Sequence, residues 1–513
     1  MTGNAPLKRL GRDVLRAVSP RLLDRVQVAR ARRRYLGDPR QGPRRLLVEP
    51  TTACNHRCVM CMDHSPRLER PTPPRSMPFE RIERLLRDAA AMGTTEVWLA
   101  GRGEPLLHPD VVQIIALAHA LGMRSQVTTN GGRLTPEMAD LLCEAGLDML
   151  SVSINAGRPE TYARVHRAPA GDRARVLETM ERISRRPGPR PDLMASIVLS
   201  ALNHTELLEF GRDALAAGAR TLVVGGMRGV PFDGRDLFLK DADWARVRED
   251  LAGLRDLAAA AGARVLVDNI PPEAGTAAGQ WPYASMGCFV GHMFAVVDVE
   301  GGVRGCCSCV DALGSLEEAS FAQVWRSEAY RRFRIACREI PSAGLTPAHC
   351  GCRECGNIDD NIAVQREVRL RFSAGGRPSR FASRLDLAAA LWRHFRDVLP
   401  DRGEGEGLRD VTVGGEPGLA VRRLQALGIV AGCPQPAAAP LFEPDHIACR
   451  EEVAGIAQRA LEAMGAPADV ARRLIANAAP RQGPPTELVL KTEVERWLAA
   501  VRAAWGRAPH PPA

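Results

Sequence analysis

Residues 46–61 read LLVEPTTACNHRCVMC, and this stretch decides what the rest of the chain is expected to be. Residues 46–49 form an apolar, strand-like run, and Cys54, Cys58 and Cys61 follow it with the spacing C-x3-C-x2-C. A four-iron iron–sulfur cluster takes four thiolate ligands. A run of three cysteines supplies only three of these four ligands, so one iron keeps an open position. A catalytic zinc likewise keeps one position open for its reactant. The loop therefore predicts a metal cluster that can also bind a small chelating ligand.

The size and composition of the chain are those of a globular protein with more than one domain. Its 513 residues exceed what one hydrophobic core usually fills. We find no apolar stretch of membrane-spanning length, and no apolar segment follows the basic N-terminal residues as it would in a secretory signal. We therefore expect a cytoplasmic protein, in which clustered thiols among the fourteen cysteines bind metal rather than form disulfides.

The net charge of +9 comes almost wholly from arginine, since the chain has only three lysines, Lys8, Lys240 and Lys491. Arginine excess together with many alanines and glycines looks like codon bias, so the charge is weak evidence for a nucleic-acid partner. Basic residues gather between Lys8 and Arg45 on an amphipathic pattern. We expect a solvated surface helix there, with contact to a membrane surface or an acidic partner as the alternative.

Between residues 44 and 240, short apolar runs alternate with helical patterns, which is typical of a parallel α/β unit. Six such units predict an open, partial (β/α)6 barrel, with its chemistry at the carboxyl ends of the strands. The expected strands are residues 46–49, 96–100, 125–128, 149–153, 193–199 and 221–224.

The rest of the chain divides by composition into four segments. Residues 1–43 are the basic helical N-terminal segment, and residues 241–285 are expected to be a helical connection. Residues 286–365 form a small, cysteine-rich α+β module, in which Gly301 marks the turn of a hairpin. Residues 380–513 read as a helical C-terminal region without a chemical motif that we recognise.

The cysteine loop resembles the cluster loop of the radical S-adenosylmethionine (SAM) enzymes, and three further strand ends support the resemblance. Residues 101–105, Gly-Arg-Gly-Glu-Pro, resemble the family's Gly-Gly-Glu-Pro element. Residues 128–131 are similar to its Thr-Asn-Gly turn, and residues 151–155 to its Ser-hydrophobic-Asp element. The alternative for a lone cysteine triplet, a zinc knuckle or inert thiols, does not account for these elements at successive strand ends.

The resemblance also assigns residues to the cofactor. It implies that Gly103 and Glu104 hold the ammonium group of SAM, that Asn130 belongs to the cofactor site, and that Ser153 faces the SAM ribose or carboxylate. Asn155 stands where the family usually has Asp. We expect His56, within the cysteine loop, to face solvent. No catalytic acid or base is assigned.

A second group of cysteines resembles the SPASM and Twitch extensions of some radical SAM enzymes. Cys288-x12-Gly301-x4-Cys306 is similar to their opening, and Cys352-x2-Cys355 to their closing pair. Four thiolates fill every iron of one cluster. Because no cysteine follows in residues 356–361, we expect one auxiliary cluster, of the [4Fe-4S] type.

The assignment of the auxiliary ligands leaves alternatives open. Cys307, Cys309 or Cys350 could replace one of the four named cysteines. A structural zinc site would suit four thiolates equally well.

The resemblance implies an enzyme that cleaves SAM reductively to a 5′-deoxyadenosyl radical, which removes a hydrogen atom from the substrate. The auxiliary cluster would assist oxidation or epimerisation of a small molecule, such as a sugar or aminocyclitol. The alternative is a maturase that crosslinks, epimerises or oxidises a ribosomally made peptide. In both cases the electron comes from a donor such as flavodoxin or ferredoxin. A transfer-RNA methylthiolating enzyme is a third hypothesis, but we see neither the N-terminal cysteine-bearing domain nor the C-terminal RNA-binding barrel of that family. A non-catalytic electron carrier is a fourth hypothesis, but it would have no need for Glu104.

Overall fold

The computed structural model describes most of the chain, including all but one of the cysteines discussed above. The expected N-terminal segment 1–43 lies almost entirely outside the described residues, and so does Cys350. The described residues are 28–29, 31, 35, 41–68, 73–230, 232–270, 287–343, 352, 355, 358–368, 382–404, 415–430, 433–435, 438–441, 448, 450–479 and 488–507.

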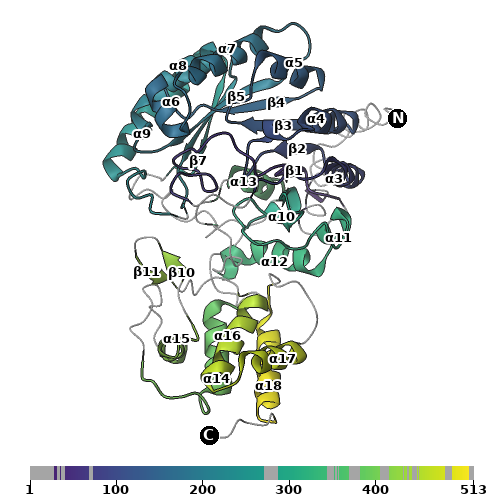
Figure 1. The fold of residues 1–513 in the computed structure, drawn as a ribbon, viewed down its shortest axis with the longest axis vertical. Helices are drawn as coiled ribbons and strands as arrows, with labels where there is room; N and C mark the ends of the chain where they lie inside the picture. Colours follow the sequence, from purple (N-terminus) through teal and green to yellow (C-terminus); the bar gives the residue numbers. More distant parts are fainter. Residues whose placement is uncertain are drawn as a thin grey trace.

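One nine-stranded sheet forms the centre of the molecule, in the order β7-β6-β5-β4-β3-β2-β1-β8-β9. All neighbouring strands are parallel except β8 and β9, which form an antiparallel hairpin. The strands are β1 (Arg45–Val48), β2 (Glu96–Leu99), β3 (Arg124–Thr129), β4 (Met149–Ser153), β5 (Asp192–Leu199), β6 (Thr221–Gly226), β7 (Arg264–Asp268), β8 (Phe294–Val297) and β9 (Val303–Arg304). The curved sheet with helices along its outer side is the expected open, partial barrel (Figure 1).

The helices that cover the sheet follow from the apolar spacing of their residues. In α3 (Phe79–Ala91), the buried residues are Ile82, Leu85, Leu86 and Ala89, which share one face of a helix. The other core helices are α4 (Val111–Ala120), α5 (Pro136–Glu144), α6 (Pro159–His166), α7 (Gly171–Arg185), α8 (Leu207–Ala216) and α9 (Asp241–Ala260), with short 3₁₀ turns η1 (Pro105–Leu107) and η2 (His204–Glu206).

Three strands, β7, β8 and β9, extend the sheet beyond the six core strands that the sequence predicts. The segment 241–285 is not purely helical, because β7 follows α9 and pairs in parallel with β6. At the other edge, β8 pairs in parallel with β1, so the auxiliary hairpin continues the barrel sheet. The cysteine-rich module is thus attached to the barrel through backbone hydrogen bonds as well as side chains. Its helices are α10 (Val290–Met293), α11 (Phe321–Trp325), α12 (Glu328–Ala343) and α13 (Ile358–Val368).

The C-terminal region is helical, as expected, and has a hydrophobic core of its own. It lies at the far end of the molecule from the barrel, with α12 between them (Figure 1). Arg332 of α12 joins the two parts through a buried, two-pronged ion pair with Glu493, at 2.7 and 2.9 Å. The elements of this region are α14 (Arg384–Phe395), α15 (Gly415–Ala426), β10 (Cys433–Gln435), β11 (Ala438–Leu441), α16 (Arg450–Ala463), α17 (Ala468–Ala478) and α18 (Lys491–Trp505).

Among the described helices, none combines the length and the apolar character that crossing a bilayer requires.

Candidate active site

The three-cysteine loop begins directly after β1, at the edge of the barrel where the parallel strands end. The Cys61 amide donates to the carbonyl of Cys58 (3.0 Å), which closes a tight turn between these two cysteines. The amides of Asp63 and His64 then donate to the Cys61 sulfur, at 3.4 and 3.2 Å. Backbone N–H groups directed at a sulfur favour its thiolate form, which is the form that binds metal.

Burial acts against this preference in the metal-free protein. It raises the pKa of all three thiols, to about 11 for Cys54. Because a bound metal requires thiolates, metal binding releases the protons that burial retains. Three thiols gathered in one short loop therefore fit a cluster site rather than a set of reactive cysteines.

Gly103 lies against the cysteine loop so closely that only glycine fits there. A Cβ atom at this position would lie 2.3 Å from the carbonyl oxygen of Thr51 and 2.6 Å from that of Ala53. The next residue, Glu104, donates its amide to the same Ala53 carbonyl at 2.7 Å. The predicted SAM element is thus joined by backbone contact to the loop that carries the ligands.

Glu104 is 2% exposed, and three donors fix its carboxylate. Oε1 accepts from the Thr129 hydroxyl (2.7 Å) and the Leu106 amide (3.0 Å), and Oε2 accepts from the Asn130 amide (2.7 Å). Burial raises the pKa of Glu104 to about 7, against the opposing effect of these hydrogen bonds. An ammonium group in contact with this carboxylate would lower that pKa again.

Asn130 links the third strand end to the cysteine loop. Its side-chain amide donates to Asn55 Oδ1 at 2.9 Å and lies 3.7 Å from the Cys54 sulfur. Its own Oδ1 accepts from the Gly132 amide at 2.7 Å. The structure therefore places Asn130 beside both the cluster loop and Glu104, which the sequence assigned to the same site.

Ser153 and Asn155 lie at the end of β4, as predicted. Ser153 is half-buried, and its hydroxyl is 3.4 Å from that of Ser196. Asn155 is buried with a φ of 54°, and its Oδ1 accepts from the Val198 amide at 2.8 Å. Asn155 therefore connects β4 to β5, a structural role that an amide serves in place of the family's carboxylate.

A buried histidine pair adjoins the cluster loop, and the sequence did not indicate it. His56 is 4% exposed, so the expectation that it faces solvent was wrong. Its Nδ1 lies 3.4 Å from Nδ1 of His166, which in turn is 3.3 Å from the Cys58 sulfur. His166 Nε2 lies 3.0 Å from the carbonyl of Ile154, and burial lowers the pKa of this histidine to about 3. His166 is 108 residues from Cys58 in the chain, so no local spacing could have revealed it.

The four predicted auxiliary ligands gather in the module beyond the hairpin. Burial raises the pKa of Cys352, and the neighbouring sulfurs of Cys288 and Cys355 raise it further. The Cys355 sulfur likewise contributes to the raised pKa of Cys306. The hairpin turn contains Gly301 at a φ of 90°, the left-handed conformation that glycine favours. These four thiols fit one metal cluster, because they are close and of one chemical type, with three of them buried and Cys352 half-buried.

A fifth sulfur lies in this group, and the sequence did not assign it. Cys337 of α12 is 2% exposed and hydrogen-bonds with the Cys288 side chain. The Cys288 amide also donates to the carbonyl of Cys337 at 3.2 Å. Of the alternatives that the sequence left open, Cys307 is exposed next to Cys306. Cys309 is disulfide-bonded, so the expectation that clustered thiols do not form disulfides was wrong for this residue. Cys337 lies within the helix α12 and belongs to none of the cysteine motifs, so the sequence did not indicate that it lies beside the predicted ligands.

Comparison with known proteins agrees with this geometry. Residues 48–212 match the radical SAM superfamily, and residues 288–356 match the SPASM iron–sulfur cluster-binding domain. The chain belongs to the radical SAM superfamily and carries a SPASM domain. Its cofactors are therefore a [4Fe-4S] cluster with SAM in the barrel and an auxiliary iron–sulfur cluster in the SPASM domain.

Several known proteins are similar to parts of this chain. A probable GTP 3′,8-cyclase of Thermococcus kodakarensis is 36% identical over 120 residues, 23% of this chain and 38% of that protein. The mycofactocin maturase MftC of Mycolicibacterium smegmatis is 29% identical over 61% of this chain and 76% of that protein. SuiB of Streptococcus suis, a solved structure, aligns with 73% of this chain and 89% of its own, with 16% identity and a TM-score of 0.49. The chain spans half or less of the length of three GTP 3′,8-cyclases that it matches.

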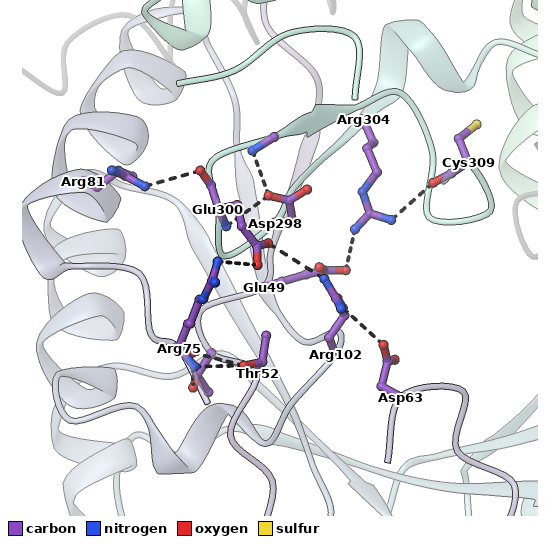
Figure 2. Close-up of polar contacts among 12 residues, drawn as sticks. Glu49, Thr52, Asp63, Arg75, Arg81, Arg102, Asp298, Glu300, Arg304 and Cys309 are labelled. Carbon is purple, nitrogen blue, oxygen red and sulfur yellow. Dashed lines mark hydrogen bonds and ion pairs between the residues drawn. The ribbon is translucent and has the colours of Figure 1, made fainter. Parts of the chain in front are cut away.

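Charged side chains join the radical SAM core to the SPASM hairpin (Figure 2). Arg102, inside the Gly-Arg-Gly-Glu-Pro element, lies 3.1 Å from Asp63 of the cluster loop and 3.8 Å from Glu300 of the hairpin. Arg75 lies 3.8 Å from Glu300 as well. The hairpin therefore contacts the residues that flank both the cysteines and the SAM element.

A buried ion pair forms the centre of this network. Arg304 of β9 donates to Glu49, directly after β1, at 2.6 Å and to the Cys309 carbonyl at 3.2 Å (Figure 2). Burial raises the pKa of Glu49, although Arg304 opposes the effect. Glu49 Oε2 and Arg304 Nε find no hydrogen-bond partner among the described residues.

Proposed function

We propose that this chain cleaves SAM reductively and uses the resulting radical to remove a hydrogen atom from a small molecule, such as a sugar or aminocyclitol. The auxiliary cluster would then assist oxidation or epimerisation of that substrate. The observation that carries the SAM-dependent part of the proposal is the fixed carboxylate of Glu104, which lies next to the three-cysteine loop and forms no ion pair among the described residues.

Different residues of the barrel would bind the cluster and SAM. Cys54, Cys58 and Cys61 supply three thiolates and leave the fourth position of a [4Fe-4S] cluster to SAM. When bound, the reduced cluster supplies the electron that cleaves SAM to methionine and a 5′-deoxyadenosyl radical. In this proposal Glu104 accepts the ammonium group of SAM, and Ser153 faces its ribose or carboxylate. Fixed hydrogen bonds around Glu104 mean that little reorganisation is needed when SAM binds.

The SPASM domain would hold the second cluster through Cys288, Cys306, Cys352 and Cys355. Full ligation by four thiolates suits electron transfer rather than substrate binding, since no iron remains open. The parallel pairing of β8 with β1 fixes this domain against the barrel.

A second candidate function is maturation of a ribosomally made peptide by crosslinking, epimerisation or oxidation. The similarity to the maturase MftC favours it, because that match extends over 326 residues, well beyond the 48–212 region of the core. A peptide would use the same cofactors and the same barrel opening.

The test is anaerobic incubation of the reconstituted protein with SAM and dithionite, followed by chromatographic measurement of 5′-deoxyadenosine. We expect release by the native chain and by Cys143→Ala, a buried cysteine of α5 outside the site, and no release by Cys58→Ala. Equal release by Cys58→Ala and the native chain would refute the proposal.

The substrate class is tested in the same assay. Faster 5′-deoxyadenosine release with aminocyclitols or sugars supports the first function, and faster release only with peptides supports the second.

A further inference from the structure

Arg228 bridges the end of the barrel and the SPASM cluster loop. It follows β6 by two residues, and its side chain is 28% exposed. One end of the guanidinium, Nη2, lies 3.0 Å from Asp268 Oδ2 at the end of β7, and the other, Nη1, lies 3.3 Å from the Ser308 hydroxyl. Ser308 is 80 residues away in the chain, in the loop that carries Cys306.

The backbone that carries Arg228 is held in place from the neighbouring strand. The side-chain amide of Asn269, directly after β7, donates to the carbonyl of Met227 at 3.0 Å. A Cβ atom on Gly226 would lie 2.1 Å from the carbonyl oxygen of Asn269, so the two strand ends approach closely only because this residue is glycine. Arg228 therefore projects from a fixed position rather than from a freely moving loop.

Ser308 connects the guanidinium to a cluster ligand. Its hydroxyl accepts from Arg228, and its amide lies 3.5 Å from the Cys306 sulfur, to which it donates. Burial lowers the pKa of Arg228, whereas the carboxylate of Asp268 and the sulfurs of Cys307 and Cys355 raise it. The net pKa of Arg228 is raised. Arginine stays charged at every physiological pH, so a permanent positive charge lies beside Ser308, whose amide donates to the Cys306 sulfur.

We propose that the positive charge of Arg228 raises the reduction potential of the auxiliary cluster, and that the carboxylate of Asp268 limits this effect. Reduction adds one negative charge to a cluster. A nearby cation stabilises the reduced form, and a nearby carboxylate opposes it, to an extent that grows as water is excluded. Arg228 would thereby set how readily the auxiliary cluster takes an electron from a substrate radical.

This inference rests on the proposed function, because it assumes a cluster on Cys288, Cys306, Cys352 and Cys355. The experiment therefore uses the full chain with Cys54, Cys58 and Cys61 replaced by Ala, so that only the auxiliary cluster can form. Iron content and the amplitude of the electron paramagnetic resonance (EPR) signal report whether it forms. Potentiometric titration with dithionite, followed by EPR, reports its midpoint potential.

Two substitutions at Arg228 and its partner should shift the potential in opposite directions. Arg228→Met should lower the midpoint potential, and Asp268→Asn should raise it. Arg228→Lys, which keeps the charge, should lie between native and Arg228→Met. Arg235→Met is the matched control, because Arg235 lies on the same loop but is 71% exposed and pairs with Asp233. It should leave the potential unchanged.

The outcomes distinguish a failure of the auxiliary cluster site from a failure of the role proposed for Arg228. If no variant in this background, including the parent, binds iron, the proposed auxiliary site fails. If the cluster forms and Arg228→Met and Asp268→Asn leave the potential unchanged, or move it in one common direction, the role of Arg228 is refuted. Should Arg228→Met alone fail to fold, Arg228→Lys and Asp268→Asn still decide the question through their potentials.

Discussion

At the scale of single residues, we expect recognition of SAM to depend on one buried carboxylate, that of Glu104. Glu104 accepts three hydrogen bonds from Thr129, Leu106 and Asn130, and its pKa is raised because burial outweighs them. Burying a charged carboxylate costs folding free energy unless a cation pairs with it. The ammonium group of SAM is the cation that the proposed function supplies.

Glu104→Gln should weaken SAM binding by about 10- to 100-fold, since a hydrogen bond to a charged group contributes about 1.5–3 kcal/mol. The dissociation constant of the reconstituted protein for SAM, measured anaerobically by equilibrium dialysis, checks this. Glu144→Gln, at the exposed end of α5, is the control and should bind SAM as the native chain does. Unchanged affinity in a folded Glu104→Gln variant would contradict the role.

The raised pKa of Glu104 also predicts the direction of a pH effect. A carboxyl group with a pKa of about 7 is increasingly neutral below that pH, and a neutral group attracts the ammonium of SAM less. The dissociation constant should therefore rise as pH falls from about 8 to 6, approaching tenfold per unit at the low end. In Glu104→Gln the slope should disappear, and a slope that persists there would assign the effect to another group.

At the scale of elements, the hairpin β8–β9 depends on an ion pair as well as on its pairing with β1. Glu49 and Arg304 are both nearly buried, with side chains 8% and 12% exposed. Removing one partner of such a pair leaves an uncompensated charge, whereas replacing both with apolar residues is often neutral.

Arg304→Met should destabilise the protein by about 3–5 kcal/mol, and the double variant Arg304→Met/Glu49→Leu should recover most of that loss. Urea unfolding of the cluster-free protein measures both. Arg87→Met is the control, because its pair with Glu83 lies on the exposed surface of α3 and should cost about 0.5 kcal/mol or less. A similar loss for Arg304→Met and Arg87→Met would show that the pair does not hold the hairpin.

The six core strands could be predicted from the sequence because each is a short apolar run followed by a helical pattern. Strand β7 could not, because it is an edge strand with Leu266 40% exposed, directly after the long helix α9. The hairpin was recognised from Gly301, but its parallel pairing with β1 is a long-range contact that local pattern does not encode. The same reason explains why Glu104 was found in a motif while His166 and Cys337, brought in from distant helices, were not.

At the scale of the whole molecule, two metal sites lie on one continuous sheet, and the C-terminal helices form a separate core. The core cysteines lie between β1 and β2 in the chain. Of the SPASM cysteines, Cys288 precedes β8, and Cys306, Cys352 and Cys355 follow β9. The cysteines that follow the closing pair in the sequence are Cys433 and Cys449, both in the C-terminal region. We therefore expect one auxiliary cluster.

The reconstituted chain should therefore hold about eight iron atoms, four for each of two clusters. Replacing Cys54, Cys58 and Cys61 with Ala should leave about four, and replacing Cys288 and Cys306 instead should also leave about four. Iron and sulfide analysis checks these values. A content near twelve would indicate a second auxiliary cluster and contradict the assignment.

The most direct test of the central claim is an EPR measurement on the cluster of the barrel alone. In the full chain with Cys288 and Cys306 replaced by Ala, the dithionite-reduced cluster should show a changed spectrum when SAM is added, because SAM would bind the iron that we expect the three cysteines to leave open. A spectrum that is identical with and without SAM, or a protein that retains only zinc after anaerobic reconstitution, would contradict the account.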